Sequence, residues 1–216
     1  KPMSISRDVH ILDWADPAGL RKAEADYGHQ KQVNLIRDAI KRLSANSKLH
    51  VVAICQAAAP TLLALDGLDT KNMTLTLLAA PLVDGPGGIS HLFDPDNAEE
   101  TLRSAEALVT LSGNGSRILP GAIQLAAIMH GSGGAMRLLS SATTVEAMGI
   151  SPARYLGAKA RRLALLDARN IPARLLLENL KANFIERRHL ASLPNRNLPI
   201  HLVAGADDQV VPASQT

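Results

Sequence analysis

The sequence predicts an α/β protein built around a parallel sheet, and three observations support that fold class. Strand-like and helix-like segments alternate between residues 9 and 80. Residues 49–54 form a continuous, partly β-branched apolar run, and residues 200–204 form a similar run after a long stretch without strong strand patterns. Because strand–helix–strand units connect with a right-handed crossover, this order predicts a parallel sheet.

The first two expected elements precede the run at residues 49–54. Residues 9–12 (VHIL) are short, apolar and bounded by aspartates, which predicts a strand. Residues 27–43 predict an amphipathic helix, because Val33, Ile36 and Ile40 fall at helical spacing with charges between them.

Three strands and one helix complete the expected sheet region. Residues 49–54 (LHVVAI) predict a strand buried on both faces, as in a fully covered parallel sheet. An alanine- and leucine-rich segment ending at residue 65 predicts a buried helix, and residues 73–80 (MTLTLLAA) predict a further strand. Residues 200–204 (IHLVA) predict the last strand, followed by the turn GADDQ.

The strand pattern is interrupted between residues 82 and 197. Glycine- and proline-rich loops there separate helical patches, of which the strongest are 98–111, 122–129 and 171–184. We therefore expect three regions, and we expect the second to cover one edge of the sheet. They are the first part of the core at 1–87, a helical cap or insertion at 88–197, and the last strand with its loop at 198–216.

Composition excludes several functional classes. The 216 residues suffice for one core, the formal net charge is only +3, and no stretch of basic residues interleaved with aromatics favours nucleic acid. A single cysteine excludes an internal disulfide and fits a reducing, cytoplasmic location. No uninterrupted apolar stretch reaches membrane-spanning length, and no His, Cys and Asp cluster has the spacing of metal ligands.

That single cysteine, Cys55, follows the apolar strand and precedes a helix in the pattern Ala-Ile-Cys-Gln-Ala. A small-x-nucleophile-x-small pattern is typical of a nucleophile elbow, a strained turn that exposes its central side chain. The helix N-terminus should favour the thiolate, and the backbone N–H of Gln56 should face a developing oxyanion. The alternative is a buried structural thiol in an alanine-rich core.

A second feature, the segment IHLVAGADDQVVP, has the form of the acid-bearing loop of an α/β-hydrolase. It follows the insertion, as expected for the chain order nucleophile, acid, histidine. Asp208 is the candidate acid in preference to Asp207, because it directly precedes the residue that leads into Val-Val-Pro. The alternative is an Asp-Asp surface turn, and Asp84, after the third strand, is a fallback acid that more simply forms a turn.

These segments together resemble a known group. DVHILDWADP, HVVAICQAAAP, MTLTLLAAPLVDGP and HLVAGADDQVVP are similar to the polyhydroxyalkanoate synthase and intracellular depolymerase branch of the α/β-hydrolase superfamily. The resemblance covers most of the sheet-forming segments and is weak from about residue 88 to 196. It implies an α/β-hydrolase-like parallel sheet with a helical cap insertion, present here as a truncated portion of the full fold.

The resemblance also implies a chemistry and a partner. Cys55 would form a thioester with a 3-hydroxyacyl unit, with Asp208 as the triad acid. A depolymerase passes that unit to water or coenzyme A, whereas a synthase takes it from coenzyme A and passes it to the growing polymer. Coenzyme A would thus be an acyl acceptor or donor, no other cofactor is implied, and the partner would be the polymer or its granule surface.

The motif departs from both branches of the group. Synthases carry glycines around the cysteine, where this sequence has Ala53 and Ala57. Cysteine followed by glutamine resembles the depolymerases, although their motif has a proline directly after the glutamine and the proline here is Pro60. The pair Asp13-Trp14 is also similar to the depolymerases, which makes depolymerisation the first expectation.

The catalytic histidine is not identified. None of the seven histidines follows Asp208, those at 50 and 201 lie in strands, and those at 91 and 130 lie in insertion loops. We expect residues 1–216 to be part of a longer protein, with the histidine beyond Thr216 and the second oxyanion donor before Val9, and to be inactive alone. A synthase, a non-catalytic hydrolase-like module and a small-molecule ester or thioester hydrolase remain alternatives, and oligomeric state is open.

Overall fold

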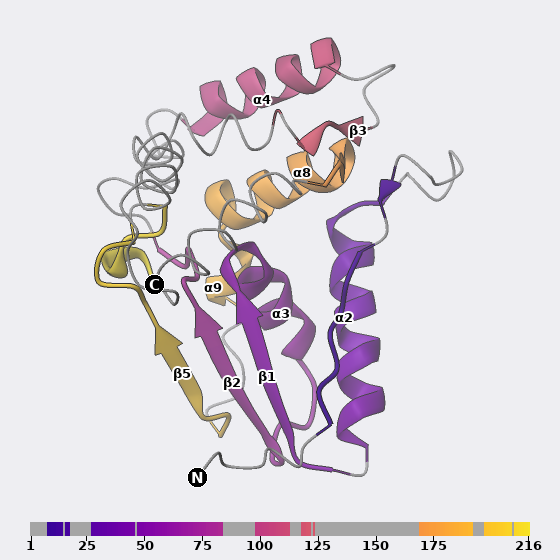
Figure 1. Ribbon diagram of the computed structural model, residues 1–216, viewed down its shortest axis with the longest axis vertical. Coiled ribbons are helices and arrows are strands. Elements are labelled where there is room, and N and C mark those ends of the chain that lie inside the picture. Colours follow the sequence, from indigo (N-terminus) through magenta and orange to yellow (C-terminus); the bar gives the residue numbers. More distant parts are fainter. Residues whose placement is uncertain are drawn as a thin grey trace, which may run out of the picture.

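A computed structural model describes most of the sheet and the helices around it (Figure 1). The described residues are 8–14, 16–17, 27–45, 47–83, 98–112, 118–121, 123, 169–191, 197–208 and 210–216.

A three-stranded parallel sheet forms the centre, with strand order β1-β2-β5. Strand β1 spans Leu49–Ile54, β2 spans Met73–Leu78, and β5 spans Ile200–Val203. The register aligns β1 with β2 along their full lengths, and β5 pairs with the second half of β2. The predicted α/β class with a parallel sheet is therefore confirmed, and the residue ranges of these three strands agree with the sequence patterns to within two residues.

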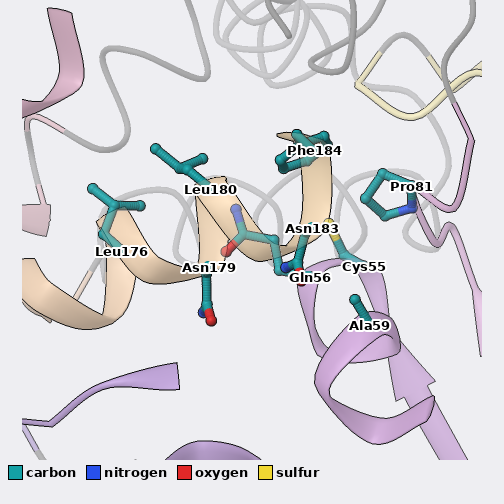
Figure 2. Close-up of a pocket in the computed structure, with 9 residues that line it drawn as sticks. All are labelled: Cys55, Gln56, Ala59, Pro81, Leu176, Asn179, Leu180, Asn183 and Phe184. Carbon is teal, nitrogen blue, oxygen red and sulfur yellow. The ribbon is translucent and has the colours of Figure 1, made fainter. Parts of the chain in front are cut away.

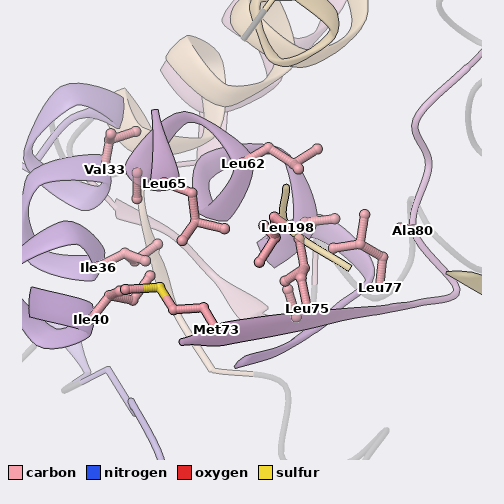
Figure 3. Packing of buried hydrophobic residues seen from close by; sticks show 13 residues of the cluster. Val33, Ile36, Ile40, Leu62, Leu65, Met73, Leu75, Leu77, Ala80 and Leu198 are labelled. Carbon is pink, nitrogen blue, oxygen red and sulfur yellow. The ribbon is translucent and has the colours of Figure 1, made fainter. Parts of the chain in front are cut away.

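Helices α2 (His29–Ser44) and α3 (Ala58–Leu65) pack on one face of the sheet. Val33, Ile36 and Ile40 of α2 are buried against α3 and the sheet, as their helical spacing predicted (Figure 3). Leu62 of α3 and Leu75 of β2 are fully buried at the centre of this cluster. Burial of such side chains stabilises the fold by about 1.5 to 3 kcal/mol each, so this face positions the turn between β1 and α3 firmly.

Two expectations about the sheet are wrong. Strand β1 is buried on one face only, and Val52 and Ile54 on its other face are 53% and 57% exposed. An apolar run cannot distinguish a strand covered on both faces from one covered on a single face. The expected strand at residues 9–12 is also absent, because these residues pair with no strand and Val9 and Ile11 remain largely exposed.

The insertion contributes helices beyond the carboxyl ends of the strands (Figure 1). Helix α4 spans Ala98–Ser112, and α8 spans Ala173–Leu180 and continues into a π-helical turn at Lys181–Ile185, both close to the predicted ranges. Helix α9 (Arg188–Ala191) follows. The expected helix at 122–129 lies almost wholly outside the described residues.

The insertion has a small apolar core of its own. Val109 of α4, Leu119 and Ala173 are buried together, separate from the cluster under the sheet. A short antiparallel pair that the sequence did not predict, β3 (Ile118–Leu119) with β4 (Ile171–Pro172), joins these segments. The insertion thus folds around its own core, and α8 contacts α2 where the two regions meet.

Polar contacts fix α8 on the first turn of α2. The Glu178 carboxylate accepts a hydrogen bond from the His29 backbone N–H at 2.7 Å. The His29 ring donates from Nδ1 to Asn179 at 2.6 Å, and Asn179 donates to Gln32 at 3.2 Å. A carboxylate at a helix N-terminus accepts a hydrogen bond from a free backbone N–H and interacts favourably with the positive end of the helix dipole. These contacts hold α8 and its π-helical turn in place above the sheet.

The chain ends with β5, a turn at residues 206–207 and a short 3₁₀ turn at Ala213–Gln215. Backbone N–H groups of Leu82 and Val83 donate to the Gln215 carbonyl, which ties this turn to the segment after β2. Within the described ranges, every helix is too short or too polar to cross a membrane.

Candidate active site

Cys55 lies at the turn between β1 and the first helical residues. Its backbone has a φ of +52°, in the left-handed region that non-glycine residues rarely adopt. A 3₁₀ turn at Cys55–Ala57 leads directly into α3. The sequence therefore folds into a strand–turn–helix with strain at its central residue, which is the backbone geometry predicted for a nucleophile elbow.

The two alanines that flank Cys55 are in different environments. Ala53 is 2% exposed within the sheet, so a larger side chain there would disturb the core. Ala57 is exposed, so packing among the described residues does not require a small residue at that position. The requirement for small neighbours on both sides is therefore supported at Ala53 and not at Ala57.

The Cys55 thiol is shifted toward its neutral form. Burial raises its pKa most, a hydrogen bond from the Gln56 backbone N–H lowers it, and the charge of Asp208 raises it again. The backbone N–H at this helix N-terminus therefore favours the thiolate, as expected, but the net pKa still lies above the ordinary thiol value. Desolvation and a nearby carboxylate outweigh the single backbone donor.

Asp208 stabilises the loop that follows β5 through hydrogen bonds to its backbone. Its Oδ1 accepts hydrogen bonds from the backbone N–H groups of Val210 and Val211 at 2.9 and 3.0 Å. Its own N–H donates to the Gly205 carbonyl at 3.3 Å, and a Cβ at Gly205 would lie 3.3 Å from that of Asp208. Asp207 is exposed. Asp208 is thus the half-buried carboxylate of the pair, with its oxygen held by backbone hydrogen bonds.

The sheet brings Cys55 and Asp208 toward each other. Strands β1 and β5 flank β2 and run parallel, so both residues follow the carboxyl ends of their strands on the same edge of the sheet. The effect of Asp208 on the Cys55 pKa reflects this proximity. Two residues separated by 153 positions in the chain therefore lie close enough to interact electrostatically, although Asp208 does not line the pocket beside Cys55.

A pocket adjoins Cys55 where the π-helical turn passes over the elbow (Figure 2). The space free of protein atoms is about 360 Å³ and includes open solvent, so the site is a shallow, open pocket whose enclosed part is about large enough for one water molecule. Most of its walls are apolar, and polar side chains come from the elbow and from the last turns of α8. The lining residues are Cys55, Gln56, Ala59, Pro81, Leu176, Asn179, Leu180, Asn183 and Phe184.

The insertion residues of this pocket were not identified from the sequence. The spacing of residues 171–184 predicted a helix, but neither its π-helical end nor its position above Cys55. Asn183 is the clearest omission, because it is 8% exposed and its side-chain oxygen has no hydrogen-bond partner. A polar residue near the end of an apolar helical patch is a weak pattern, and only the fold reveals its position in the pocket.

No described histidine lines this pocket. His50 hydrogen-bonds Thr74 and Thr76 on the exposed face of the sheet, as expected for a strand residue facing a neighbour. His201 lies 6.5 Å from His50 between ring centroids. The candidates at positions 91 and 130, and the fallback acid at position 84, lie outside the described residues.

His189 is the most buried of the described histidines. It is 0% exposed, and its Nε2 donates to the Leu82 carbonyl at 3.0 Å. Burial lowers its pKa most, the Leu82 hydrogen bond raises it, and the charge of Arg187 lowers it further, with a net lowering. It is a neutral core histidine at neutral pH. In the ranges that the structure covers, no three His, Cys, Asp or Glu side chains gather as metal ligands.

Comparisons with protein-family models, with curated proteins and with solved structures found no match. The geometry of this site and the resemblance of its sequence motifs are therefore the basis for a function.

Proposed function

We propose that this protein is an α/β-hydrolase-type enzyme that cleaves poly(3-hydroxyalkanoate) esters through Cys55. The observation that carries the proposal is the strained backbone of Cys55 at a strand–helix turn, with Asp208 close enough to affect its pKa. A buried structural thiol requires neither feature. The strand order, with the acid-bearing strand separated from the cysteine-bearing strand by β2, also supports the proposal.

The proposed reaction proceeds in two acyl-transfer steps. The Cys55 sulfur attacks the ester carbonyl while its proton passes to a histidine base, and the Gln56 backbone N–H stabilises the oxyanion. Collapse breaks the ester C–O bond, the leaving alkoxide takes the proton, and a thioester remains on Cys55. Water, or the thiol of coenzyme A, then attacks the thioester and restores the cysteine.

Asp208 has the chemistry of the triad acid in this scheme. Backbone N–H groups fix its Oδ1, which leaves Oδ2 to orient the histidine and to stabilise its cationic form. An imidazolium placed between Asp208 and Cys55 would also lower the thiol pKa, reversing the shift produced by burial and by Asp208 alone. The raised pKa of the thiol is therefore compatible with the proposed nucleophile once its base is present.

The test compares the full-length protein with its Cys55→Ala variant on two substrates. Amorphous polyhydroxybutyrate tests depolymerisation through released hydroxy acid, and 3-hydroxybutyryl-coenzyme A tests acyl transfer through released coenzyme A. We expect acid release from the polymer that is lost in the variant. Coenzyme A release with polymer growth would instead identify a synthase, and equal activity of both proteins would contradict a role for Cys55.

A non-catalytic binding module is the second candidate. The neutral thiol and the lack of a histidine among the described pocket residues favour it. Such a module would bind polymer granules without releasing acid, and Cys55→Ala would leave granule binding unchanged. Granule binding by both proteins, with no acid from either, would favour the module over the enzyme.

A further inference from the structure

We propose that Asn183 recognises the hydroxyl group of a hydroxyacyl chain bound beside Cys55. The inference rests on the proposed function, because it assigns a substrate-recognition residue to the same pocket. Asn183 and Cys55 line one pocket, although they are 128 positions apart in the chain (Figure 2). The recognised group is the free alcohol at the hydroxyl end of the chain, because every internal 3-oxygen of the polyester is esterified and has no hydrogen to donate, and the acceptor is the Asn183 side-chain oxygen.

The side-chain oxygen of Asn183 is a buried acceptor with no protein donor. Asn183 is 8% exposed, and its Oδ1 has no hydrogen-bond partner. Most buried polar atoms in native proteins are paired, so this acceptor can bind a donor on the pocket side, either a water molecule or a donating group of a ligand. An alcohol donates a hydrogen bond from the ligand side, whereas an unsubstituted acyl chain cannot.

The backbone around Asn183 is specialised to present it. Residues Lys181–Ile185 form a π-helical turn, in which the Glu186 N–H donates to the Lys181 carbonyl five residues earlier at 2.8 Å. Such turns are rare and occur frequently at functional sites. The contacts of α8 with α2 fix the base of this turn, because Asn179 is bonded to both His29 and Gln32.

The other walls explain why one hydrogen bond would be selective. Leu176, Leu180 and Phe184 from the same helical segment, together with Ala59 and Pro81, give the pocket an apolar surface. Asn179, the other insertion amide in the lining, already uses both its oxygen and its nitrogen on α2. A hydroxyl on the acyl chain therefore has Asn183 as its acceptor from the insertion, and the hydrocarbon part of the chain contacts the apolar walls.

The test measures binding in the full-length Cys55→Ala protein, where acyl transfer cannot occur. Calorimetry compares the N-acetylcysteamine thioesters of 3-hydroxybutyrate, butyrate and 3-oxobutyrate. One hydrogen bond corresponds to about threefold to tenfold in affinity, so we expect the hydroxybutyryl thioester to bind tighter than butyryl by that factor. The 3-oxobutyryl thioester, whose oxygen accepts but does not donate, should bind like butyryl.

Two variants of similar size isolate the role of Asn183. Asn183→Leu removes the acceptor and should abolish the preference, whereas Asn183→Asp keeps an acceptor oxygen and should retain it. Equal affinities with Asn183 intact, a preference that survives Asn183→Leu, tight binding of the 3-oxobutyryl thioester, or no binding by any thioester would each overturn the proposal. The comparison with Asn183 intact decides the matter even where a variant fails to fold.

The outcomes separate this inference from the proposed function. Acid release that depends on Cys55, combined with equal thioester affinities, would refute the role of Asn183 and retain the enzyme. A hydroxyl preference without any release of acid would retain the recognition role and refute the enzyme.

Discussion

The strained backbone of Cys55 predicts that glycine at this position gives a more stable protein than alanine, the opposite of the usual effect. We expect Cys55→Gly to be more stable than Cys55→Ala, although glycine normally destabilises relative to alanine. Both variants lack the sulfur, so the comparison isolates the backbone. An L-residue in the left-handed region costs about 1 to 2 kcal/mol, and Cys55 has a φ of +52°. Glycine relieves this cost but loses about 0.4 to 1 kcal/mol through the freedom of the unfolded chain.

The midpoints of these ranges give an advantage to glycine of about 0.8 kcal/mol in the free energy of unfolding. That corresponds to roughly 2 to 3 °C in melting temperature for a chain of this size. Urea unfolding of the two variants measures the difference. A free energy of unfolding that is lower for Cys55→Gly than for Cys55→Ala would refute the strained elbow.

Two alanines provide matched controls for this measurement. Ala79, after β2, has a φ of +47°, so Ala79→Gly should also stabilise, by a similar amount. Ala58, the first residue of α3, has a φ of −60° and is 1% exposed. Ala58→Gly should destabilise by at least about 1 kcal/mol, since it combines glycine's helix penalty with a lost buried methyl group.

Three further predictions concern the charges and the docking of α8. Asp208→Asn should lower the Cys55 pKa by removing a nearby negative charge, so the pH profile of iodoacetamide labelling should shift to lower pH. Asp207→Asn, at an exposed position, should leave the profile unchanged. The reverse pattern would exclude Asp208 from the site. Gly28→Ala should destabilise the protein, because its Cβ would overlap the Glu178 carboxylate, and thermal unfolding should show a smaller cost in a Glu178→Ala background. Burial alone would raise the Glu178 pKa, but hydrogen bonds from Arg174 and from the His29 N–H lower it overall. The contribution of Glu178 to the free energy of unfolding is therefore present above its unfolded pKa and is lost as pH falls through the folded pKa. Glu178→Gln should flatten the dependence of stability on pH in that acidic window, and an unchanged slope would contradict the carboxylate contact.

Periodicity predicted the elements of the fold better than it predicted their burial. The helical spacing of Val33, Ile36 and Ile40 identified both helix α2 and its buried face, because one apolar stripe specifies one packing surface. The run LHVVAI identified β1 without revealing that Ile54 faces solvent, since β-branched residues favour strands on either face. The apolar tetrapeptide at residues 9–12 formed no strand, because a strand also needs a paired neighbour.

The candidate site was predictable where local chemistry fixes the geometry. Cys55 follows an apolar strand and precedes a helix, and that local order was enough to predict its strained turn. The shift of its pKa was not predictable, since it depends on burial and on Asp208, 153 positions away. Asn183 reaches the pocket through a π-helical turn and through the docking of α8 on α2, and no sequence pattern reports either one.

The most direct test of a nucleophilic Cys55 is intact-protein mass spectrometry after brief mixing of the full-length protein with 3-hydroxybutyryl-coenzyme A. We expect the protein to gain the mass of one hydroxybutyryl group, carried by the peptide that contains Cys55, with release of coenzyme A. The Cys55→Ala variant should gain nothing. An unmodified protein, or the same adduct on the variant, would contradict the assignment of Cys55 as the acyl-accepting residue.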